Sequence, residues 1–146
     1  MGKILKDKIA ISGTTGFVGK NLKNFLIQNN IKCKTISRST FQKNKLPLIS
    51  DCGCFVHLVG LGIETKRKSF EEVNVELTKK VVDLCKKSKI KKIIYFSGLG
   101  VSSKSTSDYF ISKFKAEQLI IKSGLDYTIF RPSYICLLYT SPSPRD

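Results

Sequence analysis

The sequence predicts an α/β protein with a doubly wound, Rossmann-type parallel sheet and helices on both of its faces. Short apolar strands alternate with helical stretches along the chain, which is typical of right-handed β-α-β crossover units. Residues 55–59 and 93–96 are nearly continuous apolar runs, as expected where both faces of a parallel sheet are covered. The first strand also leads directly into a glycine-rich turn and a helix.

The first half of the chain is predicted to hold one helix among short strands. Residues 16–28 carry apolar side chains at helical spacing, and two asparagines follow and end the helix. Residues 46–49 could form a short edge strand, because the proline among them is tolerated at a sheet edge. The other strands predicted here are residues 8–12, 31–36 and 54–59.

The second half continues the alternation with two longer helices. Residues 70–87 are amphipathic and are expected to turn one apolar side inward. A serine-rich loop leads into a helix over residues 107–123, and Gly124 suits the position after a helix end. The strands predicted here are residues 92–97 and 127–131. The residues expected to face inward from the first of these helices are Val73, Leu77, Val81, Val82 and Cys85.

Length and composition indicate one globular domain, and the lack of a membrane segment or secretion signal leads us to expect it in the cytoplasm. The chain has 146 residues, of which 41% are hydrophobic and 25% charged, enough for a single core. No apolar run approaches the roughly 20 residues of a membrane helix. Residues 1–7 lack the apolar segment of a secretion signal. We therefore expect no membrane association.

The net charge of +15 has two interpretations. A nucleic acid or an anionic membrane surface would be attracted to so basic a chain. The alternative is composition, because lysine far outnumbers arginine and the lysines are scattered, as in proteins from AT-rich genomes. We favour the compositional interpretation, and expect a small-molecule substrate and no specific nucleic-acid partner.

The five cysteines and the one histidine do not predict a metal site. Cys52 and Cys54 are separated by one residue, which is poor spacing for zinc, and His57 lies in an apolar run. Because no secretion signal is evident, we expect reduced thiols. No bound metal is expected.

A glycine-rich turn lies between the first predicted strand and the first predicted helix, where a dinucleotide-binding motif must lie. Gly13 can make the tight turn, Gly16 can let backbone N–H groups approach a pyrophosphate, and Gly19 can allow close packing of helix and strand. The helix N-terminus favours the anion. The spacing is GxxGxxG rather than GxGxxG, and an ordinary strand–helix turn is the alternative. The predicted pyrophosphate-binding residues are Gly13, Thr14, Thr15, Gly16, Phe17, Val18 and Gly19.

The end of the second predicted strand bears on the choice of cofactor. A site that prefers NAD usually carries an acidic residue there, whereas an NADP site places an arginine nearby. This chain has Ser37 and Arg38, with no carboxylate before Asp51. We therefore expect NADP to be preferred over NAD. Arg38 could instead stack on adenine or lie on the surface.

Tyr109 and Lys113 are spaced so that they share one helix face. A cation beside the phenol would lower its pKa from about 10, which would make Tyr109 a usable general acid or base. Ser97 is predicted at the carboxyl end of a strand, where ligands bind in α/β sheets. The predicted catalytic residues are therefore Ser97, Tyr109 and Lys113.

Together these residues resemble the short-chain dehydrogenase/reductase superfamily, in its extended and atypical branches (the NAD-dependent epimerase/dehydratase-like group). The resemblance covers residues 7–135. It implies that Ser97 and Tyr109 polarise a substrate carbonyl or hydroxyl, and that Lys113 binds the nicotinamide ribose and tunes Tyr109. The resemblance also rests on residues 57–60, 73–75 and 131–133. Within these it implies further cofactor-lining residues, namely Leu58, Val59, Gly60, Pro132 and Ser133.

Three departures from the superfamily pattern matter, the first being that residues 57–60 read HLVG where HLAA or HLAG is more usual. The segment between Arg38 and Asp51 is short, so the usual second helix and third strand are expected to be reduced. The part that follows the last predicted strand, which supplies the substrate lobe in the extended branch, is absent. We expect an NAD(P)-dependent oxidoreductase or a sugar-nucleotide-type epimerase/dehydratase, as a fragment inactive by itself. A non-catalytic redox sensor or a respiratory-complex accessory protein is the alternative.

The last eleven residues differ in kind from the rest of the chain. Residues 136–146 match, residue for residue, an in-frame translation of a transposase-type sequencing adapter. A genuine Ser/Pro linker is the alternative interpretation. We expect residues 1–135 to form one NAD(P)-binding domain of a longer protein, with a sheet that is incomplete at its C-terminal end.

Overall fold

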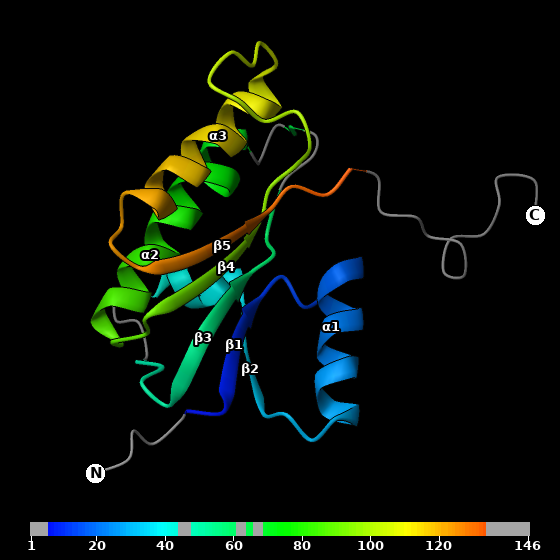
Figure 1. The fold of residues 1–146 in the computed structure, drawn as a ribbon, viewed down its shortest axis with the longest axis vertical. Coiled ribbons are helices and arrows are strands. Elements are labelled where there is room, and N and C mark those ends of the chain that lie inside the picture. Colours follow the sequence, from blue (N-terminus) through cyan, green and yellow to red (C-terminus); the bar gives the residue numbers. More distant parts are fainter. Residues whose placement is uncertain (1–5, 44–47, 61–63, 66–68, 134–146) are drawn as a thin grey trace, which may run out of the picture.

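The fold is a single five-stranded parallel sheet, seen in a computed structural model that describes residues 6–43, 48–60, 64–65 and 69–133. The strand order is β2-β1-β3-β4-β5 (Figure 1), and every neighbouring pair is parallel. The predicted parallel sheet is therefore confirmed. The strands are β1 (Lys8–Ser12), β2 (Cys33–Ile36), β3 (Cys52–His57), β4 (Lys92–Phe96) and β5 (Asp126–Phe130).

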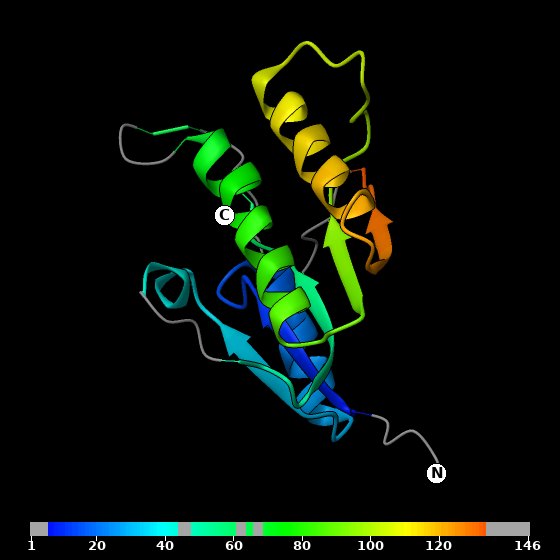
Figure 2. The same cartoon turned by 90° about the vertical axis from the view of Figure 1, so that its left-hand side faces the viewer.

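Helices cover both faces of the sheet, as predicted. Helix α1 (Phe17–Gln28) lies on one face, and α2 (Leu77–Lys87) and α3 (Asp108–Ile121) lie together on the other (Figures 1 and 2). The larger core cluster lies between the sheet and the helix pair, and includes Phe55, Val81 and Ile120. A smaller cluster beneath α1 includes Ile11, Leu26 and Val56.

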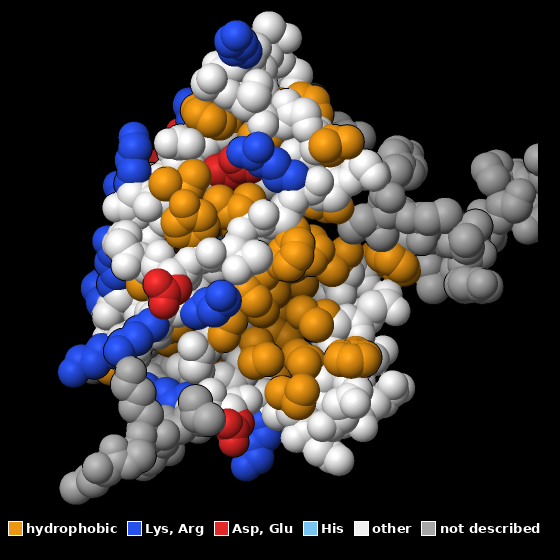
Figure 3. All heavy atoms as spheres, viewed as in Figure 1, with side chains coloured by type: hydrophobic (Ala, Val, Ile, Leu, Met, Phe, Trp, Pro, Cys, Tyr) orange, Lys and Arg blue, Asp and Glu red, His pale blue; other side chains and the backbone are white. Residues whose placement is uncertain are grey.

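The face that carries α1 is only partly covered. Side chains on a strand alternate between the two faces, and Ile94 packs in the cluster beneath α1, so Phe96 lies on the same face as Ile94. The Phe96 and Phe130 rings contact each other, with centroids 5.3 Å apart, and Phe130 is 49% exposed. Figure 3 shows hydrophobic side chains gathered on the side of the molecule from which it is viewed.

The segment before β3 differs from the possible edge strand at residues 46–49. Of those residues, Leu48 and Ile49 are described, and they form no strand; residues 46–47 lie outside the described residues. Ile49 is fully buried, and its N–H donates to Ser88 Oγ rather than to a strand neighbour. A short 3₁₀ helix, η1 (Arg38–Gln42), replaces the expected second helix, so this part of the chain is reduced as predicted.

The predicted helix over residues 70–87 begins as a different kind of helix. Residues Glu71–Glu76 form a π-helix, η2, which continues directly into α2. The wider turn of a π-helix lets three consecutive residues, 73–75, all be buried. Thr78 Oγ1 donates to the Asn74 carbonyl, just past the point where the two helix types meet. The five residues expected to face inward are all buried.

Two further predictions concern membrane association and the last eleven residues. In the described ranges, no helix is long and apolar enough to cross a membrane. The segment 136–146, predicted to derive from an adapter, lies outside the described residues, and its origin stays a prediction.

Candidate functional site

The glycine turn joins β1 to α1 and packs tightly against the end of β3. Gly13 has a φ of +81°, and a Cβ there would lie 2.9 Å from backbone atoms of Leu58 and Val59. A Cβ on Gly19 would overlap the Gly13 carbonyl. Packing within the protein therefore requires glycine at both positions.

Gly16 differs from the other two glycines of the turn, because the protein itself leaves room for a side chain there. Its backbone is extended, with a φ of −76°, and an added Cβ would make only an ordinary 3.6 Å contact with Gly13 O. Gly16 is the N-cap of α1 and provides no side chain to cap the first N–H groups. Those groups and the free space suit an anion at the helix N-terminus.

A cleft of about 470 Å³ lies along the carboxyl ends of β1, β2 and β3. Ligands bind at this edge in doubly wound sheets. The cleft joins the glycine turn, the end of β2 and the segment after β3, all of which the sequence predicted as cofactor-binding. Its lining residues are Gly13, Thr14, Thr15, Gly16, Thr35, Ile36, Ser37, Arg38, Leu58, Val59 and Gly60.

The cleft lining differs from the sequence prediction at nine positions. Thr35 and Ile36 line it and were missed; their position at the end of β2, just before Ser37, was the available signal. Seven residues predicted to bind the cofactor do not line it, namely Phe17, Val18 and Gly19 on α1, Tyr109 and Lys113 on α3, and Pro132 and Ser133 after β5.

Arg38 begins η1 at the rim of the cleft. The neighbouring Ser37 hydroxyl bonds to those of Ser39, at 2.7 Å, and Thr40, at 3.2 Å. Arg38 also borders a second hollow that contains Glu72 and Glu76. In the part of the chain that the structure describes, no ion pair within 4.0 Å engages Arg38.

The predicted catalytic residues lie on α3 and at the end of β4. Ser107 caps α3 by accepting from Phe110 N, which fixes the turn that carries Tyr109. Lys113, one turn later, is buried, and its Nζ donates to Tyr95 Oη at 3.1 Å and to the Phe96 carbonyl at 3.0 Å. Ser97 directly follows β4. Its Oγ is the one buried side-chain N or O atom of the described residues that has no hydrogen-bond partner.

The electrostatics of Tyr109 differ from the sequence expectation. Burial raises the pKa of Tyr109 above its ordinary value of 10, whereas a neighbouring lysine was expected to lower it. The hydrogen bonds of Lys113 go to Tyr95 and Phe96 instead, so the expectation was wrong for this arrangement. Burial lowers the pKa of Lys113 to about 8, although Glu117 acts in the opposite direction.

Gly60 connects the cleft with the buried lysine. It lines the cleft, and a Cβ on it would lie 3.2 Å from Lys113 Nζ and 3.7 Å from Asn74 Oδ1. Gly60 therefore lies between the cleft and Lys113 on α3.

The segment after β5 packs against the loop that follows Ser97. Leu99 N, in the loop after Ser97, donates to the Pro132 carbonyl at 3.0 Å. Arg131 holds the buried Glu117 carboxylate through two hydrogen bonds, at 2.9 and 2.6 Å. Pro132 therefore lies beside the loop that follows Ser97, and the cofactor-lining roles of Pro132 and Ser133 stay predictions.

A buried polar network behind the site was not predicted. His57 Nδ1 bonds to Ser12 Oγ at 2.7 Å, and His57 Nε2 bonds to Thr78 Oγ1 at 3.0 Å. Because Thr78 donates to the Asn74 carbonyl, it accepts from Nε2, and Nδ1 accepts from Ser12. Burial lowers the pKa of His57 to about 3, so the ring is neutral.

The same network reaches α3. Asn74 Nδ2 donates to Ser112 Oγ, which donates to the Tyr109 carbonyl at 2.7 Å. The hydrogen bonds of this network join five elements, β1, β3, η2, α2 and α3, and no short sequence pattern predicts such long-range pairs.

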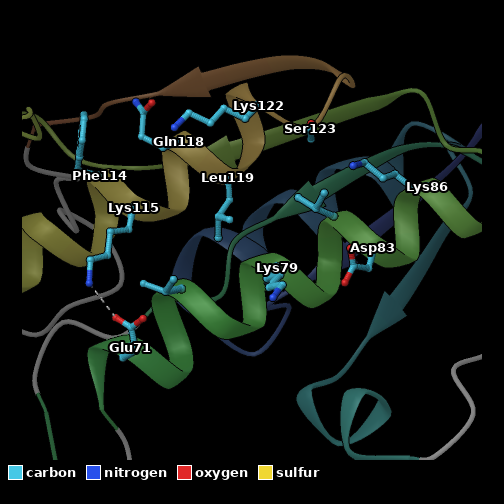
Figure 4. A pocket seen from close by; sticks show the side chains of 12 residues that line it. Glu71, Lys79, Asp83, Lys86, Phe114, Lys115, Gln118, Leu119, Lys122 and Ser123 are labelled. Carbon is cyan, nitrogen blue, oxygen red and sulfur yellow. Dashed lines mark hydrogen bonds and ion pairs between the residues drawn. The ribbon is translucent and has the colours of Figure 1, made fainter.

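A further groove lies between α2 and α3 on their outer side (Figure 4). It has a volume of about 590 Å³, and no residue predicted for the site lines it. Lysines surround an apolar floor, and one of them, Lys115, pairs with Glu71 at 3.4 Å. The groove is separate from the cleft at the carboxyl ends of the strands.

A family model described as NAD(P)H-binding matches residues 49–138, more than half of the chain. The chain belongs to the NAD(P)H-binding family. This family assignment agrees with the resemblance seen in the sequence and with the position of the cleft.

A curated relative is the mitochondrial 40 kDa subunit of NADH-ubiquinone oxidoreductase from Neurospora crassa. It is 23% identical over a stretch that covers 84% of this chain and 39% of that protein. The chain thus spans about two fifths of the length of this relative.

Solved structures share the fold of this NAD(P)H-binding chain. A short-chain dehydrogenase/reductase superfamily protein from Agrobacterium tumefaciens, with bound NAD, matches with a TM-score of 0.64 and 16% identity, over 85% of this chain and 48% of that one. UDP-glucuronic acid 4-epimerase from Bacillus cereus, in complex with NAD, gives 0.64 and 19%, over 86% and 56%. The enzyme WbmH from Bordetella bronchiseptica, in complex with NAD⁺, gives 0.66 and 20%, over 86% and 55%.

Proposed function

We propose that this chain is the cofactor-binding part of an NAD(P)-dependent oxidoreductase or a sugar-nucleotide-type epimerase/dehydratase. The observation that carries the proposal is the position of Gly60, between the cleft and Lys113 Nζ. A dinucleotide held at the glycine turn would extend past Gly60 toward Tyr109, Lys113 and Ser97. The lobe that binds the substrate would be supplied by a longer parent protein.

The residues of the cleft fit such a cofactor. The uncapped N-terminus of α1 and the free space at Gly16 would receive the pyrophosphate. Leu58, Val59 and Gly60 would line the cofactor on the β3 side, and Lys113 would hold the nicotinamide ribose. The nicotinamide, when bound, supplies the acceptor or donor of a hydride.

The chain's own residues would handle the substrate oxygen and its proton. Because burial raises the pKa of Tyr109, this phenol is protonated at neutral pH and can donate to a substrate oxygen. Ser97 Oγ, which is buried without a partner, could bind the same oxygen. Lys113 would orient the ribose.

The choice between NADP and NAD rests on Arg38. Arg38 lines the cleft beside the end of β2, where a 2′-phosphate would lie. A bidentate contact between arginine and phosphate is a strong, charge-assisted interaction. We therefore propose a preference for NADP.

A substitution at Gly16 tests dinucleotide binding without disturbing the fold. The variant Gly16→Val fits the extended backbone but would place two methyl groups where the pyrophosphate approaches. We expect the affinity for both NADH and NADPH, measured by calorimetry, to fall by about 100-fold or more through lost hydrogen bonds. The melting temperature should stay close to that of the wild type.

A contrasting variant separates binding from folding. Gly19→Ala should destabilise the protein, because its Cβ overlaps the Gly13 carbonyl. If Gly16→Val keeps full affinity for both cofactors, the cleft is not the dinucleotide site and the proposed function is wrong.

A further inference from the structure

Tyr95 lies between the buried histidine and the buried lysine of the site. It is on β4 and only 1% exposed. Its ring stacks on that of His57, with centroids 5.6 Å apart and planes at 22°. His57 is itself held from both sides by Ser12 and Thr78. The position of the Tyr95 ring is therefore fixed through three other elements of the fold.

The hydrogen bonds of Lys113 show what the Tyr95 hydroxyl does. A charged lysine has three N–H donors, and two of them go to Tyr95 Oη and the Phe96 carbonyl. Within the described residues the third N–H has no acceptor. The ammonium group of Lys113 is open toward Gly60, because Gly60 has no Cβ, which would lie 3.2 Å from Nζ. Gly60 in turn lines the cleft.

We propose that Tyr95 is a positioning residue for Lys113. Its hydroxyl and the Phe96 carbonyl together fix the ammonium group, so that the third N–H is presented past Gly60 to the ribose hydroxyls of a bound dinucleotide. This role rests on the proposed function for its ligand, but the Tyr95–Lys113 contact can be tested without one.

The charges around Lys113 make it depend on such neutral acceptors. Glu117 raises the pKa of Lys113 but forms its hydrogen bonds with Arg131, and His57 is neutral because burial lowers its pKa to about 3. Tyr95 and Tyr109 are protonated phenols at neutral pH, since burial raises the pKa of both. No ion pair within 4.0 Å engages Lys113 among the described residues. Loss of one neutral acceptor should therefore change its protonation.

The first experiment measures Lys113 in the chain without cofactor. In protein labelled with ¹³C-lysine, the Lys113 side-chain resonance gives its pKa, which burial places at about 8. Tyr95→Phe keeps the stacked ring but removes the hydroxyl, and should lower that pKa by about 1 to 2 units. Tyr127→Phe, a matched change on β5, should leave it unchanged. If Tyr95 had only a structural role, the pKa of Lys113 would equal the wild-type value in both variants.

The second experiment measures NADH binding between pH 6 and 10 in the same proteins. Wild-type affinity should decline as the pH rises through the pKa of Lys113, and Tyr95→Phe should shift that decline down by the same 1 to 2 units. The inference is overturned if either the Lys113 pKa or the pH profile stays unchanged in Tyr95→Phe. If the wild type binds no NADH, the proposed function fails instead, and the resonance experiment still tests the Tyr95–Lys113 contact.

A third measurement needs no Tyr95 variant and covers the case that Tyr95→Phe does not fold. In wild-type protein labelled with 3-fluorotyrosine, the ¹⁹F resonance of Tyr95 should shift with a midpoint near that of Lys113. The shift should vanish in Lys113→Met. A Tyr95 resonance that does not change as Lys113 titrates would contradict the Tyr95–Lys113 contact.

Discussion

At the scale of single residues, one buried histidine should make the folding stability of this domain sensitive to mild acid. His57 is the only histidine in the chain, and its ring is fully buried and hydrogen-bonded through both nitrogens. Burial lowers its pKa from 6.5 to about 3. Below pH 6.5 the unfolded state therefore binds a proton that the folded state does not.

Stability should consequently fall as the pH drops from 6.5 toward 3. The loss should approach about 1.4 kcal/mol per pH unit, because the unfolded histidine is charged while the folded one is not. Urea unfolding at pH 7.5, 6.5 and 5.5 measures this slope, and His57→Gln, which cannot titrate, should be flatter over that range. Parallel slopes for the two proteins would show that His57 does not cause the acid sensitivity.

Arg38 should distinguish the two cofactors. Arg38→Ala is expected to weaken NADPH binding by about 10-fold or more and to leave NADH nearly unaffected, because only NADPH carries the 2′-phosphate. Calorimetric titration of both cofactors measures the difference. Equal weakening would mean that Arg38 stacks on the adenine, and a wild-type preference for NADH would refute the proposed preference for NADP.

At the scale of elements, most of the fold could be predicted because each unit follows a local pattern. The strand and helix of the glycine turn, the inward face of residues 70–87 and the cap at Ser107 all depend on residues that are near in sequence. The 3₁₀ helix at Arg38–Gln42 and the loop at Ile49 depend on tertiary contacts, such as the bond from Ile49 N to Ser88 Oγ. No local pattern shows those contacts.

The same distinction holds for the site. The glycine turn and the spacing of Tyr109 and Lys113 could be read directly, since each is a short motif. The direction of the Lys113 ammonium could not, because it is set by Tyr95 and Phe96 on another element. The predicted pKa direction for Tyr109 was wrong because burial of the phenol raises its pKa, and burial depends on residues distant in sequence.

The N-cap of α3 offers a test at this scale. Ser107→Ala removes the acceptor for Phe110 N and should destabilise the domain by about 1 kcal/mol. Ser103→Ala, in the same serine-rich loop but outside the cap, should have little effect. Chemical denaturation of both variants gives the comparison. Equal stabilities would mean that the cap contributes nothing to the helix that carries Tyr109.

At the scale of the whole molecule, the two sheet faces are unequally covered. The face of α2 and α3 holds the large core cluster, whereas the other face leaves Phe130 about half exposed beside Phe96. Helix α1 also exposes Phe25, at 58%. Exposed apolar patches of this kind bind apolar dyes and favour self-association.

Phe130 should therefore dominate dye binding. Phe130→Thr is expected to lower the fluorescence of an added naphthalene-sulfonate dye and to raise the concentration at which the chain associates in light scattering. Tyr127→Thr, on the same strand but on the opposite sheet face, is the matched control. Equal effects of the two substitutions would locate the dye site elsewhere.

The π-helix at Glu71–Glu76 makes the chain intolerant of insertions and deletions at this point. Removing one residue would close the wide turn into an α-helix and rotate the preceding residues by about 100° relative to α2. The Asn74–Ser112 hydrogen bond and the contact between Phe70 and Tyr109, with centroids 5.8 Å apart, could not then both persist. Relatives with one residue fewer here should hold Tyr109 differently, whereas the loop over residues 102–106 can vary in length without that effect.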